Sequence, residues 1–68
     1  MAYLWVYESN KTWVPFDPQS NVILENLYRT GVFTRVFLPY YGRQIFCNPR
    51  NNFIIVDTAR VTIARTGY

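Results

Sequence analysis

The sequence has no histidine, one cysteine and one lysine among its 68 residues. Without histidine it cannot build a Ser-His-Asp triad, a Cys-His dyad or a histidine-ligated metal site, and one cysteine excludes a four-cysteine zinc site. Cys47 has no histidine to activate it, so we expect it to pack as a small hydrophobic side chain. A lone cysteine forms no internal disulfide, which is typical of an intracellular protein. We therefore predict that the chain is not an enzyme and uses no metal or cofactor.

Long hydrophobic runs and a basic leader are absent as well. No apolar stretch approaches the ~20 residues of a membrane span, and no basic segment precedes an apolar one near the N-terminus. The residues that are present are 50% hydrophobic and 19% aromatic, and only 16% are charged. This composition is typical of a packed domain rather than a disordered chain. We expect one domain over residues 1–68, inside the cell and without membrane contact.

Carboxylates are scarce, and the cations are unevenly placed. Residues 1–28 carry one cation and three carboxylates, whereas residues 29–68 carry six arginines and one carboxylate. The formal net charge is +3. Because the planar guanidinium suits phosphates, carboxylates and aromatic faces, an anionic partner is one interpretation. Arginines scattered over several faces of a soluble protein are the other.

Short alternating segments dominate the chain. The predicted strands, which are rich in β-branched and aromatic residues, are 3–8, 13–16, 32–38, 44–47, 53–56 and 61–64. Alternation places Phe33, Arg35 and Phe37 on one face of their strand. Pro15 cannot donate a ladder hydrogen bond, which indicates an edge strand or the end of a pairing.

One segment has helical spacing. Asp17 is a good N-cap and Pro18 suits the first helical position, while Gly31 is a typical left-handed C-cap, so we predict a helix over 18–30. The resulting order is β-β-α-β-β-β-β. It predicts an α+β fold in which a twisted, antiparallel, half-open barrel or sheet of about six strands has one helix packed against it.

The spacing of Trp5, Trp13 and Glu25, with Asp17-Pro18 before the helix, resembles the WWE domain family, which is named for two tryptophans and a glutamate. The similarity is good over residues 3–31 and weaker, but in order, over 32–65. Membership implies a half-open antiparallel sheet with one helix and no catalytic activity. It also implies binding of ADP-ribose or poly(ADP-ribose) at the open mouth of the sheet, as many members do.

The resemblance implies five ligand-binding positions. Tyr7 matches a ligand-contacting tyrosine, and Phe46 matches a second tyrosine whose ring it keeps without the hydroxyl. Ile55 falls near the pocket glutamine, so that amide is missing. Arg60 lies within one position of a phosphate-reading arginine, and Arg65 matches a basic residue at the end of the last strand.

The family's naming residues have structural interpretations. We expect Trp5 and Trp13 to lie in the core, because a small core needs large aromatic side chains. We expect Glu25 to be a structural hydrogen-bond acceptor. A possible interaction patch at a turn consists of Tyr40, Tyr41 and Arg43, with one of the two tyrosines exposed.

Three functions remain open. The first is a reader of ADP-ribose or poly(ADP-ribose), with adenine held between Tyr7 and Phe46 and phosphate held by Arg60 or Arg65. The second is a protein-interaction adaptor, of the kind a virus or phage would use, whose ligand pocket has decayed. The third is a small-barrel binder of single-stranded nucleic acid, against which the modest net charge counts. Exposed strand edges would also permit a homodimer.

Overall fold

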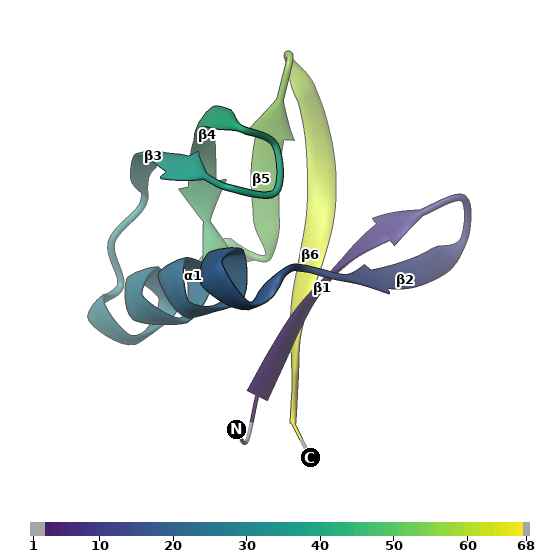
Figure 1. Cartoon of the computed structure of the whole chain (residues 1–68), viewed down its shortest axis with the longest axis horizontal. Coiled ribbons are helices and arrows are strands. Elements are labelled where there is room, and N and C mark those ends of the chain that lie inside the picture. The colour runs from purple at the N-terminus through teal and green to yellow at the C-terminus, as the bar shows by residue number, and fades with distance from the viewer. Residues whose placement is uncertain (1–2, 68) are drawn as a thin grey trace.

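The computed structural model describes residues 3–67 and contains one α-helix and one six-stranded antiparallel sheet (Figure 1). The elements are β1 (Tyr3–Ser9), β2 (Thr12–Pro15), α1 (Pro18–Thr30), β3 (Thr34–Leu38), β4 (Arg43–Asn48), the short 3-10 helix η1 (Pro49–Asn51), β5 (Phe53–Val56) and β6 (Ala59–Gly67). The strand order is β2-β1-β6-β5-β4-β3, so the sheet is open, with β2 and β3 as its edges. The predicted α+β class, the single helix and the edge position of the Pro15 strand are confirmed.

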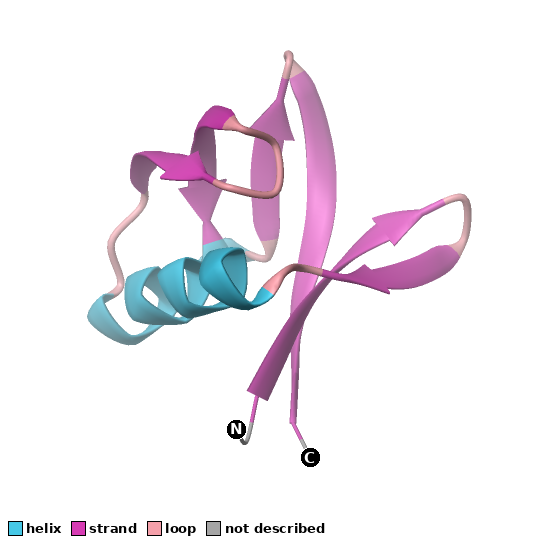
Figure 2. Cartoon of the chain, viewed as in Figure 1, coloured by secondary structure: helices cyan, strands magenta, loops and turns pink. Residues whose placement is uncertain are grey.

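β6 holds the two halves of the sheet together. Its first half pairs with β5, from Val56 opposite Ala59, and its second half pairs with β1, up to Tyr3 opposite Gly67. The first and last strands of the chain are therefore neighbours in the middle of the sheet. Figure 2 shows the β1–β2 hairpin turning away from β3, β4 and β5. This division leaves α1 to cover one face, where it packs against β1, β3 and β4.

The helix begins and ends where the local chemistry predicts. The Asp17 carboxylate accepts the Ser20 backbone N–H at 3.1 Å, which caps the first turn. Gly31 follows the last turn with φ +71°, a conformation that glycine adopts without steric cost. Arg50 then donates to the carbonyls of Tyr28 (2.8 Å) and Arg29 (3.1 Å). A cation at these carbonyls in the last turn also complements the helix dipole.

The core lies between α1 and the sheet. Its buried residues are Trp5, Phe16, Leu24, Leu38, Ile45, Cys47, Ile54 and Ile63. Trp5 is 0% exposed, so its predicted core position is confirmed. Cys47 is also buried, and this burial raises the pKa of its thiol to about 12. The thiol therefore stays protonated at neutral pH and packs as a hydrophobic group, as expected.

Trp13 contradicts the core prediction, because half of its surface (50%) is exposed. It pairs with Glu8, one position beyond Tyr7, which is the last residue of β1 that pairs with β6. At this point the hairpin has no third strand beside it. Alternation also turns the Trp13 side chain to the face that α1 leaves uncovered. Its indole instead lines a shallow hollow of about 420 Å³ with Val6, Ala64 and Thr66.

Two strands differ from their predicted bounds by more than one residue. β3 begins at Thr34 rather than at residue 32, and β6 spans Ala59–Gly67 rather than 61–64. The loop predicted over 57–60 is a two-residue turn in which Asp57 (φ +49°) and Thr58 (φ +68°) are both left-handed. Two left-handed residues match the twist of the strands in a tight hairpin. Arg60 therefore lies in a strand instead of a loop.

We expect Thr58→Gly to stabilise the protein by about 0.5–1 kcal/mol. A β-branched side chain in the left-handed region is strained by about 1–2 kcal/mol, part of which glycine loses again through its greater unfolded-state entropy. Urea unfolding followed by tryptophan fluorescence measures the change. The control Thr62→Gly, in extended β6, should destabilise, because glycine weakens a strand. A Thr58→Gly midpoint at or below that of the parent would contradict the prediction.

Candidate functional site

The sheet separates the five ligand-binding candidates onto two faces. Tyr7 is paired with Ile63, whose side chain is buried under α1, so Tyr7 lies on the helix-covered face. Phe46, Ile55 and Arg60 are direct cross-strand partners on β4, β5 and β6. Each of the three alternates with a core residue, so they lie together on the opposite, helix-free face. Tyr7 and Phe46 therefore cannot hold one adenine between them.

Tyr7 lies within an aromatic cluster on its own face. Its ring centroid is 5.2 Å from that of Phe16 and 5.4 Å from that of Tyr40, and the hydroxyls of Tyr7 and Tyr40 share a hydrogen bond. This bond, together with burial, raises the pKa of Tyr40. The Tyr7 ring is therefore already packed against two other aromatic side chains of its own face.

The three residues of the predicted interaction patch have different surroundings. Tyr40 is the exposed tyrosine of the pair, as expected of one of them, while Tyr41 packs against the core. Burial raises the pKa of Tyr41 to about 12. Arg43, the first residue of β4, makes an ion pair at 2.6 Å with Asp57 in the turn between β5 and β6. An exposed pair of this kind contributes little to stability, about 0–1 kcal/mol.

Glu25 is a buried hydrogen-bond acceptor, as predicted. Its side chain is 2% exposed and accepts the Trp5 indole N–H at 2.9 Å. Arg65 binds both carboxylate oxygens, with Nε at 2.8 Å and Nη2 at 3.0 Å, and Arg29 Nε lies 2.8 Å away. The Arg65 hydrogen bonds, followed by those of Trp5 and Arg29, lower the pKa of Glu25 to about 2 despite its burial. Arg65 is thus held by the protein's own carboxylate.

The remaining three candidates form part of a continuous row. Arg35 on β3 is paired with Phe46, which is paired with Ile55, which is paired with Arg60. We call these four residues the Arg35–Arg60 row. Ile55 is 37% exposed, so the centre of the row presents an apolar surface to solvent between two cations. Arg35 was not among the candidates, although alternation over 32–38 had placed it beside Phe33 on one face.

Two further phenylalanines extend this apolar surface. The Phe33 and Phe53 ring centroids lie 6.5 Å and 6.1 Å from that of Phe46. Phe33 is 62% exposed. The Arg60 guanidinium lies over the Phe53 ring, with Cζ 4.0 Å from the centroid. This stacking holds Arg60 in place on the surface.

The arginines differ sharply in what surrounds them. Four are held by acceptors of the protein itself: Arg29 and Arg65 by Glu25, Arg43 by Asp57, and Arg50 by carbonyls at the end of α1. Within residues 3–67, Arg35 and Arg60 are the two arginines for which no carboxylate or carbonyl partner exists. Both lie at the ends of the row, where a phosphate could reach them.

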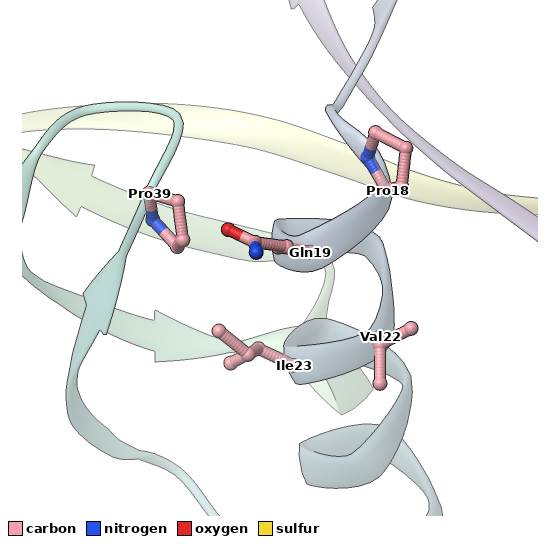
Figure 3. Close-up of a pocket in the computed structure, with 5 residues that line it drawn as sticks. All are labelled: Pro18, Gln19, Val22, Ile23 and Pro39. Carbon is pink, nitrogen blue, oxygen red and sulfur yellow. The ribbon is translucent and has the colours of Figure 1, made fainter.

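Hollows occur on both faces of the sheet. The hollow beside the Arg35–Arg60 row has a volume of about 240 Å³, and its lining includes Arg35, Gln44, Phe46, Ile55 and Thr58. A larger groove of about 520 Å³ lies between the start of α1 and the turn after β3 (Figure 3). The residues that line it are Pro18, Gln19, Val22, Ile23 and Pro39. That groove offers one amide and no charge, so it suits an apolar group rather than a phosphate.

Known proteins offer no template for this chain. No family model, curated protein or solved structure matches the chain. In the part of the chain that the structure describes, no three histidine, cysteine, aspartate or glutamate side chains come together as metal ligands. Among residues 3–67 there is likewise no helix long and apolar enough to cross a membrane.

Proposed function

We propose that the protein is a non-enzymatic binding module that takes a nucleotide-type ligand on the helix-free face of its sheet. The observation that carries the proposal is the Arg35–Arg60 row, in which two arginines that have no acceptor in the described part of the chain flank an exposed apolar centre. A base would stack on Phe46 against Ile55, and a phosphate would pair with a guanidinium.

The surroundings of the row support this chemistry. Arg60 is already stacked on Phe53, so it loses less conformational freedom when it binds a phosphate than a free side chain would. Gln44 lines the adjacent hollow, and its amide can both donate to and accept from the edge of a base. One site then combines a stacking surface, a cation and an amide.

ADP-ribose is the first probe, because the WWE resemblance names it. The location differs from the one that the resemblance implies. The proposed site uses Phe46, Ile55 and Arg60. Tyr7 and Arg65 lie outside it and keep their hydrogen bonds within the protein. The missing pocket glutamine at Ile55 is offset on this face by the nearby Gln44.

An NMR titration with ADP-ribose and with AMP tests the proposal. We expect amide shifts centred on the Arg35–Arg60 row, and we expect Phe46→Ala to weaken binding about fivefold or more through lost stacking. Arg60→Gln should weaken it through the lost phosphate pair. Tyr7→Phe is the control, since it removes a hydroxyl on the other face and should leave affinity unchanged.

Two outcomes would overturn the proposal. Shifts centred on Tyr7 and Tyr40 would place the ligand on the helix-covered face. A complete lack of response to both nucleotides would remove nucleotide binding and favour the protein-interaction adaptor, whose natural surface is the apolar groove beside α1.

A further inference from the structure

We infer that the helix-free face binds a single-stranded nucleic acid several nucleotides long, whose chain crosses β3, β4, β5 and β6 along the Arg35–Arg60 row. This inference rests on the proposed function and names its ligand class. Two features of the face carry it: the spacing of the rings and the separation of the two arginines.

The rings form a series rather than a single platform. Phe33 lies just before β3, Phe46 lies on β4 and Phe53 on β5, and the neighbouring ring centroids are 6.5 Å and 6.1 Å apart. Consecutive rings suit a ligand with consecutive bases, because one base can stack on Phe33 and the next on Phe46, while Arg60 covers the face of Phe53. A single ADP-ribose has one adenine and would leave one of these two rings without a base.

The two arginines extend from opposite ends of the row. Arg35 and Arg60 are separated by two intervening strands, so their backbones lie three strand spacings, or about 14 Å, apart. The two phosphorus atoms of a pyrophosphate share one bridging oxygen, so both side chains would have to bend over Phe46 and Ile55 to bind one pyrophosphate. A strand with one phosphate for every base reaches both.

The same spacing argues against the polymer of ADP-ribose. In that polymer, two riboses and a pyrophosphate separate one adenine from the next, so neighbouring adenines do not match rings about 6 Å apart. Duplex nucleic acid is disfavoured too, because its bases are stacked on each other and cannot reach the rings. An unpaired strand satisfies both the rings and the arginines.

Fluorescence anisotropy with labelled oligo-dT and oligo-rU of about two, four and eight nucleotides tests the inference, since sites of this kind span at least four nucleotides. We expect affinity to rise with length and then level off. Two phosphate contacts predict a slope of log K against log salt of about −1.4. Arg35→Gln and Arg60→Gln should each reduce that slope by about 0.7, and Phe46→Ala should weaken binding about 5- to 100-fold.

Control variants outside the Arg35–Arg60 row test whether the losses of affinity and of salt dependence are specific to the row. Lys11→Gln removes one charge at the β1–β2 turn and should leave the salt slope unchanged. Trp13→Leu removes an exposed aromatic ring from the other half of the sheet and should leave affinity unchanged. Circular dichroism of every variant checks that the fold is intact, and an equal loss in either control would contradict the assigned path.

The competing ligands give outcomes that separate this inference from the proposed function. ADP-ribose or AMP binding as tightly as the eight-nucleotide strand, with the same dependence on Phe46, would overturn the inference and leave the proposed function standing. Tighter binding of poly(ADP-ribose), or equal binding of a duplex, would also overturn it. If no nucleotide of any length binds, both proposals fail.

Discussion

Replacing Glu25 by alanine is expected to cost the folded state about 2–4 kcal/mol, because a buried indole N–H and two partly exposed guanidinium groups lose a charged acceptor. The carboxylate is the common acceptor for the Trp5 indole and for two guanidinium groups. Without it, the buried indole N–H loses its partner and Arg65 loses both of its hydrogen bonds. A domain of this length has about 3–10 kcal/mol of stability in total. Much of the variant should therefore be unfolded at 25 °C.

Urea unfolding monitored by tryptophan fluorescence and near-UV circular dichroism measures this cost. Glu8→Ala is the matched control, because Glu8 is an exposed carboxylate on β1 and its removal should change stability by less than about 0.5 kcal/mol. The double variant Glu25→Met with Arg65→Met should recover part of the loss, since an apolar pair can replace a buried ion pair. Equal midpoints for Glu25→Ala and Glu8→Ala would show that the cluster does not stabilise the fold.

Acidification from pH 5 to pH 2 is expected to destabilise the protein by about 2–3 kcal/mol through the same carboxylate. Hydrogen bonds from Arg65, then Trp5 and Arg29, hold the pKa of folded Glu25 at about 2, against 4.5 for an ordinary glutamate. The group thus contributes its full stability above pH 5, where it is ionised in both states. That contribution is lost as the pH falls toward 2, because protons bind the unfolded chain first.

The Glu25→Gln variant isolates this contribution. It is less stable than the parent at pH 7, but its stability should change little between pH 5 and pH 2. Asp17 is the second carboxylate to consider: burial raises its pKa, but hydrogen bonds from Ser20 lower it below the ordinary value overall. Asp17→Asn keeps a good N-cap and should retain most of the parent's acid slope. If stability still falls between pH 5 and pH 2 in Glu25→Gln but no longer does so in Asp17→Asn, the helix cap rather than Glu25 causes the acid dependence.

The arginine-rich second half of the chain resolves into two roles. Arg65 closes the Glu25 cluster and Arg50 caps α1, so both stabilise the fold. Arg35 and Arg60 stand apart on the helix-free face, and within residues 3–67 neither has a carboxylate or carbonyl partner. The excess positive charge that the composition shows is therefore less informative than the position of these two side chains. Substitution of Arg35 or Arg60 should therefore leave the stability of the fold nearly unchanged.

Several local features could be predicted because their causes are local. The helix limits follow from the Asp17-Pro18 start and the Gly31 end, which act within one turn of the chain. Trp5 could be assigned to the core because a small core needs large aromatic side chains. Glu25 could be assigned as an acceptor, but its partner Arg65 lies 40 residues away and no local pattern points to that pair.

The candidate site depended on strand register. A shift of one residue in an alignment moves a side chain to the opposite face of a sheet, so matching Phe46 to a family position could not establish that it lies beside Tyr7. The exposure of Trp13 had a similar origin, because it depends on where pairing with β6 stops. Arg35 became part of the site only once β3 was seen to pair with β4.

The chain's own chemistry thus specified a small α+β domain, its strands, its one helix and the absence of a histidine-based active site. These properties follow from residue types and from contacts between near neighbours in the sequence. Tertiary structure decided which side chains share a face, which arginines are already paired and which aromatic rings stay exposed. Those properties depend on pairings between distant segments, such as Tyr3 with Gly67 and Arg35 with Phe46, which alternation along one strand does not encode.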